Sequence, residues 1–281
     1  MLTSNPISTP PPTALITGAS RGLGLSLARE LAQDGANVIL TARTAEAAIG
    51  ASMALRRQGF SNVCSATLDV SDAQSIASFA HGSGHQIDVL INNAAVCPTG
   101  WSREATSSCW RTNVLGPLAL THALLPHMLR RGRGHIVHVS SGDGELLYLN
   151  TALQADLRAA TTERAVMRSL ARAAPPRGAY GEAPAYGPTP AYAVSKAALN
   201  ALTRITAARL APDCGVRVSA VCPGDVLTRM LSDHEPEARR RGIPPAAAAR
   251  DVVRLAVNGL GADALPLESG RFWRHGRQIQ W

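Results

Sequence analysis

Several features that define other protein classes are missing from this 281-residue chain. No run approaches about 18 uninterrupted apolar residues, so no membrane-spanning helix is expected. The five cysteines are odd in number and form no CxxC pair, which argues against a disulfide framework and against a metal site. Residues 1–12 are rich in Ser, Thr and Pro and lack the apolar core of a secretory signal. These absences favour a cytoplasmic protein with a flexible tail at residues 1–12.

Aromatic residues are also scarce, at 4% of the chain. The net charge is +8, with basic clusters at residues 130–133, 239–241 and 271–277. Proteins that bind single-stranded nucleic acids combine such charges with aromatic side chains on which the bases stack. No aromatic residues are interleaved with the first two clusters, and few are available elsewhere. We therefore expect solvated surface at these arginines, and no nucleic-acid partner.

Short apolar runs alternate with helical segments, the pattern of a parallel sheet with helices on both faces. It predicts a single Rossmann-type, doubly wound α/β domain over residues 13–281. The predicted strands are 13–17, 37–41, 62–68, 88–92, 135–140 and 216–221, with a short edge strand near 270–273. The predicted helices are 22–34, 44–58, 70–81, 106–130, 191–210 and 245–260.

Residues 142–190 interrupt this alternation. They contain no strand pattern, and residues 150–174 are rich in Ala, Arg and Leu with helical spacing. A stretch rich in Pro and Gly follows at 175–190, which is incompatible with regular structure. We interpret this segment as an insertion folded against the domain.

A glycine-rich turn lies between the first predicted strand and the first predicted helix. Glycines at that place let the backbone approach a pyrophosphate, whose charge is stabilised by the helix N-terminus. The spacing is GxxxGxG, so the generic GxGxxG fingerprint is not matched literally. The context still predicts a dinucleotide site formed by Gly18, Ser20, Arg21, Gly22, Leu23 and Gly24.

The second predicted strand indicates which dinucleotide is bound. NAD-binding units usually place an acid about 20 residues beyond the glycines, where it accepts from the ribose 2′-hydroxyl. Here Thr41–Thr44 contains no acid; instead, Arg43 lies 19 residues after Gly24, and Arg21 lies within the turn. Two guanidiniums can bind a 2′-phosphate, unless they simply face solvent. We predict NADPH/NADP+ as the cofactor.

Tyr192 and Lys196 are four residues apart on a predicted helix, so both side chains leave the same face. A free phenol titrates near pH ~10, and an adjacent ammonium favours the phenolate and lowers that pKa. Such a pair can exchange a proton with an alcohol or carbonyl oxygen. Taken alone, the spacing favours an ordinary surface helix, because a Tyr and a Lys four residues apart are common by chance.

Six short motifs follow one another along the chain: TGASRGLG at 17–24, LDV at 68–70, NNAA at 92–95, TNV at 112–114, Ser140–Ser141, and PGDVLT at 223–228. With the Tyr192–Lys196 pair, they resemble the short-chain dehydrogenase/reductase family over nearly the whole chain. Ala95 departs from the glycine of the family's NNAG motif.

The resemblance implies roles for individual residues. Ser141 would bind the substrate oxygen, Tyr192 would transfer the proton, Lys196 would lower the Tyr192 pKa and bind the nicotinamide ribose, and Asn113 would hold a relay water. Residues 224–245 would form a substrate lid. Further cofactor contacts would come from Asp69, Val70, Asn93, Ala94, Ala95, Pro223, Gly224, Val226 and Thr228.

Fifty residues separate Ser141 from Tyr192, far more than in most members of the family. This insertion, together with residues 153–158 and Trp281, resembles the monomeric carbonyl reductases. The resemblance implies a monomer that reduces a ketone, aldehyde or quinone with NADPH. Two alternatives remain: an NADP-dependent alcohol dehydrogenase or ketoreductase of a biosynthetic pathway, and a non-catalytic NADP(H) sensor.

Residues near these motifs are candidates for the substrate pocket. We expect His138 to be a packed core histidine, and Asp143 and Glu145 to be solvated or at the pocket rim. Position along the chain suggests six further lining residues: Cys97, Trp101, Tyr180, Tyr186, Leu227 and Met230.

Overall fold

The computed structural model of the protein describes residues 10–175, 183–234, 242–258, 260 and 268–281. One eight-stranded sheet has the strand order β3-β2-β1-β4-β5-β6-β7-β8. Its strands are β1 (Thr13–Ile16), β2 (Asn37–Ala42), β3 (Val63–Thr67), β4 (Val89–Asn92), β5 (Gly134–Val139), β6 (Val216–Cys222), β7 (Phe272–Arg274) and β8 (Arg277–Ile279). The first six strands have the Rossmann order, and among the described strands of this sheet only the β7–β8 pair is antiparallel. The predicted fold class is confirmed.

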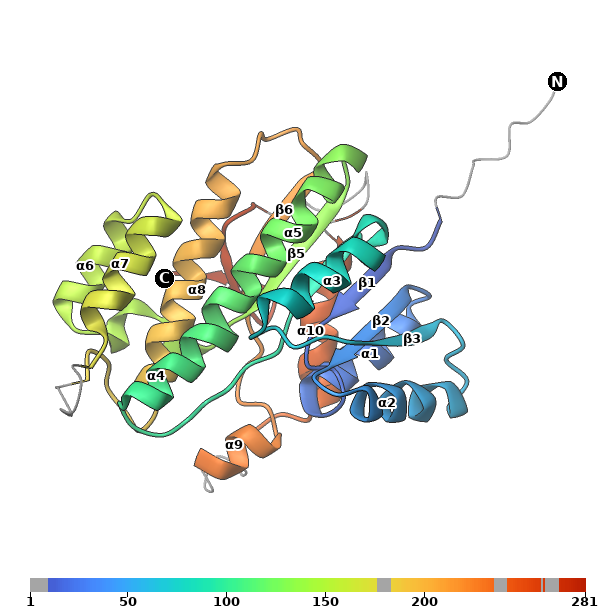
Figure 1. Ribbon diagram of the computed structural model, residues 1–281, viewed down its shortest axis with the longest axis horizontal. Helices are drawn as coiled ribbons and strands as arrows, with labels where there is room; N and C mark the ends of the chain where they lie inside the picture. The colour runs from blue at the N-terminus through green and yellow to red at the C-terminus, as the bar shows by residue number, and fades with distance from the viewer. Residues whose placement is uncertain (1–9, 176–182, 235–241, 259, 261–267) are drawn as a thin grey trace.

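Helices cover both faces of the sheet (Figure 1). On one face lie α1 (Gly22–Gln33), α2 (Ala45–Arg57) and α10 (Pro245–Asn258), and on the other α3 (Ala73–Ser83), α4 (Arg103–Cys109), α5 (Gly116–Arg131) and α8 (Pro190–Ala208). The helix α9 (Arg229–His234) lies apart from both layers, within the predicted lid. None of the described helices combines the length and the apolar character needed to cross a bilayer.

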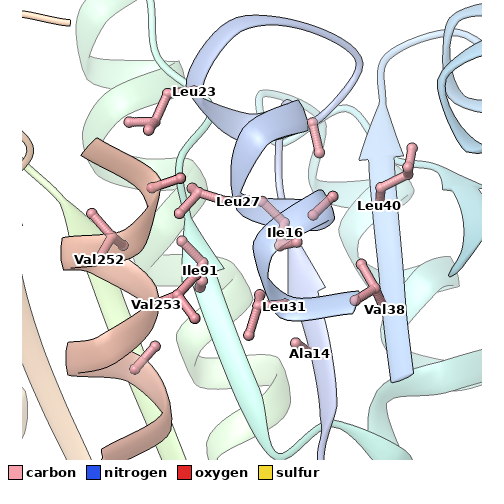
Figure 2. Close-up of a cluster of buried hydrophobic side chains, with 14 of the residues drawn as sticks. Ala14, Ile16, Leu23, Leu27, Leu31, Val38, Leu40, Ile91, Val252 and Val253 are labelled. Carbon is pink, nitrogen blue, oxygen red and sulfur yellow. The ribbon is translucent and has the colours of Figure 1, made fainter. Parts of the chain in front are cut away.

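The packing of α1 shows how the sequence builds this architecture. Leu23, Leu27 and Leu31 recur every four residues and are buried against β1 and β4 (Figure 2). Val252 and Val253 of α10 pack into the same cluster. Each such buried side chain contributes about 1.5–3 kcal/mol relative to an exposed one. This cluster fixes the start of α1, and with it the glycine-rich turn, over the sheet edge.

The described part of the predicted insertion, residues 142–175 and 183–190, contains the helices α6 (Thr151–Ala159) and α7 (Glu163–Ala173), where one long helical segment was predicted. The predicted helical segment is interrupted at Thr162, which is the N-cap of α7. The Thr162 hydroxyl accepts a hydrogen bond from the Ala165 backbone nitrogen. The Arg204 guanidinium of α8 donates to three backbone carbonyls between residues 157 and 160. The two helices therefore lie against α8 (Figure 1).

Two further differences from the prediction concern extended backbone. Leu149 and Ala185 form an isolated antiparallel bridge inside the insertion, which the sequence did not indicate. The predicted edge strand near 270–273 is a hairpin of β7 and β8, joined by His275 and Gly276 with φ of 49° and 69°. These positive φ values suit a tight two-residue hairpin turn. Most of the predicted tail and parts of the predicted lid and insertion lie outside the described residues.

Candidate active site

A cavity of about 1010 Å³ opens where the parallel strands end at their carboxyl edge, the usual ligand position in this architecture. The turn after β1 lines one part of it, and the residues around Ser141 and Tyr192 line another. Residues 222–231 form a further wall. Every predicted catalytic and cofactor residue lines this cavity except Asn113.

The glycine turn is shaped by close backbone approaches. Gly18 has φ of 63°, and a Cβ there would lie 2.9 Å from the Ala94 Cα. A Cβ on Gly24 would lie 2.5 Å from the Gly18 carbonyl oxygen and 2.6 Å from the Asn93 Nδ2. That Nδ2 donates to the carbonyls of Thr17 (2.8 Å) and Gly18 (3.2 Å). The NNAA segment thus holds the turn open at the start of α1, and the cradle fits a dinucleotide phosphate.

Arg21, Arg43 and Asp69 lie at the same part of the cavity. One Asp69 carboxylate oxygen accepts from the Ser71 backbone nitrogen (2.8 Å) and hydroxyl (2.7 Å). Burial acts to raise the pKa of Asp69, but the Ser71 hydrogen bonds and the charges of Arg43 and Arg111 outweigh it and hold the pKa below its usual value. The cationic Arg43 is therefore close to the residues expected to receive the adenosine end.

Ser140 and Ser141 follow β5 but face different surroundings. Ser140 is buried, and its hydroxyl donates to the backbone carbonyl of Lys196 at 3.5 Å. Ser141 hydrogen-bonds the Tyr192 phenol, and its Oγ accepts from the Asp143 backbone nitrogen at 3.3 Å. The structure thus places the second serine of the pair beside Tyr192, at the position predicted from the motif.

Tyr192 and Lys196 both lie in the first half of α8 and are buried. The Lys196 Nζ lies 5.4 Å from the Tyr192 ring centroid and donates to the Val139 carbonyl at 2.7 Å. Burial lowers the pKa of Lys196 to about 8.

Burial raises the pKa of Tyr192, and the neighbouring Cys97 and Asp143 act in the same direction. The Ser141 hydrogen bond opposes them. The predicted net lowering of this pKa by Lys196 is therefore wrong for this structure, because desolvation of the phenolate outweighs the stabilisation available to it.

Asn113 lies in a π-helical turn (Trp110–Leu115) between α4 and α5, and it is fully buried. Its Oδ1 accepts from the Val96 nitrogen at 2.9 Å, and its Nδ2 donates to the Val96 carbonyl at 2.8 Å and to the Ser195 Oγ at 3.0 Å. Ser195 in turn donates to the Tyr192 carbonyl at 2.7 Å. The Asn113 side chain therefore ties the loop after the NNAA segment to the first turn of α8. Its predicted role in a water relay stays a prediction.

The cavity wall contains charged residues that the sequence analysis did not assign to a site. Arg274 of β7 forms an ion pair with Glu145, whereas it was predicted to be solvated surface. His275 also lines the cavity and lies 3.1 Å from the Asp251 carboxylate. No local pattern marks the first pair, because 129 residues separate its partners.

Other predicted lining residues fall in three groups. Cys97, Leu227 and Met230 line the cavity, as does Asp143. Trp101 does not; its side chain is buried in the apolar cluster beside α8, so its predicted place at the cavity mouth is wrong. Tyr186 lines a smaller adjoining cavity of about 270 Å³, and Tyr180 lies outside the described residues.

The buried histidines are structural. His138 lies between Thr203 (2.9 Å) and Thr121 (3.4 Å), and burial together with the charge of Lys196 lowers its pKa to about 3. Burial lowers the pKa of His135 to about 4. Across the described ranges, no three His, Cys, Asp or Glu side chains are grouped so as to hold a metal ion.

The basic clusters are only partly described. In the first, Arg131 and Arg133 lie 3.1 Å and 4.0 Å from an Asp88 carboxylate oxygen, so both face an acid rather than open solvent alone. Residues 239–241 lie outside the described part of the chain.

Comparison with known proteins agrees with this geometry. The family model described as short chain dehydrogenase matches residues 12–155, and one described as Enoyl-(Acyl carrier protein) reductase matches residues 179–243. The oxidoreductase UcpA of Salmonella typhimurium is 34% identical over 226 residues, which cover 78% of this chain and 70% of UcpA. With several mammalian members of the family the match covers less than half of the relative, 35% or 44% of its length.

Solved structures share the fold over most of the chain. Salutaridine reductase from Papaver somniferum has a TM-score of 0.76 at 25% identity, covering 93% of this chain and 99% of that one. A metagenomic short-chain oxidoreductase in complex with NADP has a TM-score of 0.62 at 28% identity, covering 87% of this chain and 90% of that one. Fold, motif order and relatives lead to one conclusion: the chain belongs to the short-chain dehydrogenase/reductase family of oxidoreductases.

Proposed function

We propose that this protein is an NADPH-dependent carbonyl reductase that converts a ketone, aldehyde or quinone to the alcohol. The observation that carries the proposal is the cavity that joins the glycine cradle and Arg43 to Ser141, Tyr192 and Lys196. A reductase of this kind needs a dinucleotide site on one side of the reacting carbon and a proton donor on the other. One cavity provides room for both.

The residues at the Tyr192 end have complementary roles in this proposal. A bound nicotinamide supplies the hydride, so the overall reaction is carbonyl plus NADPH plus a proton to alcohol plus NADP+. Ser141 donates a hydrogen bond to the carbonyl oxygen, and Tyr192 delivers a proton to it as negative charge develops. Lys196 keeps a positive charge beside the phenol below pH about 8, which favours the phenolate left after proton transfer.

NADPH rather than NADH is the proposed cofactor. Arg43 and Arg21 line the cavity beside Asp69, and a guanidinium pairs with a phosphate through two parallel hydrogen bonds. Replacing Arg43 by Asp should shift the ratio of kcat/KM values for NADPH and NADH toward NADH by about 100-fold, because a carboxylate repels the 2′-phosphate and accepts from a 2′-hydroxyl. An unchanged ratio would exclude Arg43 from phosphate binding.

The same residues serve the reverse reaction, so an NADP-dependent alcohol dehydrogenase or a biosynthetic ketoreductase would use the same site. A non-catalytic sensor is disfavoured because Ser141, Tyr192 and Lys196 are all retained beside the cavity. Substrate and direction are decided by the cavity walls and by the cellular ratio of NADPH to NADP+.

We further propose that the protein is a monomer. The insertion helices α6 and α7 lie on α8, where Glu163 reaches both Arg209 (3.1 Å) and His122 of α5 (3.0 Å). This covering leaves less of the α5–α8 face available to a second copy. Light scattering on the purified protein should give a mass near 29.4 kDa, and a tetramer would refute the proposal.

The cysteines bear on the proposed compartment, the cytoplasm. All five lie within the described residues, and none of them forms a disulfide there. Thiols that stay reduced are typical of proteins in a reducing compartment, which supports the proposal.

The direct test of the proposed reaction is NADPH oxidation followed by absorbance against a panel of ketones, aldehydes and quinones, repeated with NADH. Turnover with NADPH and weak turnover with NADH would support both the reaction and the cofactor. Saturable NADPH binding with no turnover of any panel member would favour a sensor or a substrate outside the panel.

A further inference from the structure

The short turn that follows Ser141, residues 142–145, is packed on one side against α8. A Cβ on Gly144 would lie 2.9 Å from the Lys196 carbonyl carbon, so only glycine fits there without a shift of the backbone. The Asn200 side chain donates to the Gly144 carbonyl at 3.2 Å. Helix α8 thus fixes one side of this turn.

The opposite side of the turn is held by Arg274 of the β7–β8 hairpin. Its guanidinium forms an ion pair with Glu145 and a hydrogen bond with the Cys222 thiol. A Cβ on Gly142 would lie 2.7 Å from the Arg274 Nη2, so the guanidinium lies directly against the residue that follows Ser141. A side chain at residue 142 would require the Arg274 guanidinium to move from this position.

Trp281 adds a second, independent contact from the same segment. Its indole nitrogen donates to the Gly144 carbonyl at 2.9 Å. The Arg204 guanidinium of α8 lies 5.7 Å from the Trp281 ring centroid, within range of a cation–π interaction that holds the ring in place. Residues 272–281 therefore contact the turn at residues 142–145 twice, through the Arg274 guanidinium and through the Trp281 indole.

We propose that Arg274 and Trp281, which both belong to residues 272–281, are positioning residues for Ser141. This inference rests on the proposed function. In this proposal neither side chain contacts the reacting atoms. Arg274 and Trp281 both contact the turn at residues 142–145, and the Asp143 nitrogen of that turn donates a hydrogen bond to the Ser141 hydroxyl. Because the Ser141 hydroxyl also bonds Tyr192, a displaced turn separates the two groups that bind and protonate the carbonyl oxygen.

The test uses Arg274→Gln, which removes the charge, and Trp281→Phe, which keeps an aromatic ring but removes the N–H donor. The control is Arg277→Ala, which removes an exposed arginine from the same hairpin. Each test variant should lower kcat about tenfold while the KM for the carbonyl and the Kd for NADPH change by less than about threefold. The control should match the wild type. A purely structural role would instead weaken NADPH binding and thermal stability together with kcat.

Hydrogen–deuterium exchange gives a readout that needs no substrate. Peptides covering residues 141–149 should exchange about fivefold or more faster in both test variants, with unchanged exchange in the glycine turn and in the control. Unchanged exchange in residues 141–149, or kcat within twofold of wild type in both test variants, would overturn the proposal. Absence of turnover with every carbonyl compound of the panel in the wild type would count against the proposed function and not against this proposal, because the exchange result would still decide whether the hairpin orders the turn.

The coupling of Arg274 to Glu145 provides a third check. If the ion pair acts as a unit, the Arg274→Gln/Glu145→Gln double variant should lose no more of kcat than the worse single variant. Additive losses would contradict joint action through this pair.

Discussion

The two parts of the cavity are built in different ways. In the cofactor half (residues 13–95), the shape is set by backbone atoms: Gly18 and Gly24 leave no room for a Cβ, and Asn93 donates to backbone carbonyls. In the substrate half (the walls around Ser141, Tyr192 and Arg274), it is set by side chains from separate segments, such as Arg274 and Glu145, which form an ion pair in the cavity wall. A site made of backbone needs particular residues at fixed spacing, whereas a site made of side chains can be built from many combinations.

The largest effect that separates the two halves is expected for Tyr192→Phe. The variant keeps the ring, which is buried in α8, but removes the proton donor, so kcat should fall about 1000-fold, within the range for loss of a general acid. NADPH affinity, measured by fluorescence titration, should stay within about twofold. Substantial turnover by this variant would remove Tyr192 from the mechanism.

Gly24→Ala tests the cofactor half in the same way. The new Cβ would meet the Gly18 carbonyl and Asn93 at 2.5 Å and 2.6 Å, so the turn must open and NADPH affinity should fall about 100-fold. Gly50→Ala in α2 is the matched control, since a Cβ at residue 50 would meet no atom of the described residues within 4 Å and the change should favour the helix. Unaltered affinity in Gly24→Ala would show that the cradle is not the phosphate site.

The adjacent serines offer a comparison within the substrate half. Ser141→Ala removes a donor aimed at the reacting oxygen and should lower kcat about 100-fold, as the loss of other oxyanion donors does. Ser140→Ala removes only a long hydrogen bond to the Lys196 carbonyl and should change kcat by less than about fivefold. Steady-state kinetics of both variants would settle the assignment, and the reverse order of effects would make Ser140 the catalytic serine.

The smallest effect concerns stability, and it involves both faces of the sheet. His135 bonds Ala256 of α10, whereas His138 lies between α5 and α8; burial lowers their pKa values to about 4 and about 3. Below pH about 6.5 the unfolded chain binds protons that the folded chain does not, so the free energy of unfolding should fall by about 1.4 kcal/mol per pH unit for each histidine until the folded pKa is reached.

Urea denaturation at pH 6.5, 5.5 and 4.5 measures this slope. His135→Gln and His138→Gln remove one titrating group each, and each should flatten the pH dependence relative to wild type. If neither does, the acid sensitivity arises from other groups.

What the sequence could predict follows the same division. Alternating apolar runs and the leucines of α1 predicted the sheet and its helices, because burial of one face demands that spacing. The glycine turn, Arg43 and the Ser141–Tyr192–Lys196 set were named from motifs, and the structure brings all of them to one cavity.

The features of the site that the sequence did not predict depend on tertiary contacts, which leave no local pattern in the sequence. Arg274 looked like one of several surface arginines, and only the folded hairpin brings it to Glu145. The hairpin turn itself was missed because His275–Gly276 is a weak turn signal. Trp101 was expected at the cavity, but burial beside α8 gives its large ring more apolar contact. The sign of the Tyr192 pKa shift depends on burial, which sequence spacing does not determine.

The measurement that tests the central claim most directly is hydride transfer from labelled cofactor. The wild-type protein would be incubated with NADPH deuterated at the reacting position of the nicotinamide and the best carbonyl compound of the panel, and the product analysed by mass spectrometry and NMR. If the cavity joins a dinucleotide site to Ser141 and Tyr192 for carbonyl reduction, one deuterium will appear on the carbinol carbon. NADPH binding without any consumption, or an alcohol product without deuterium at that carbon, would contradict it.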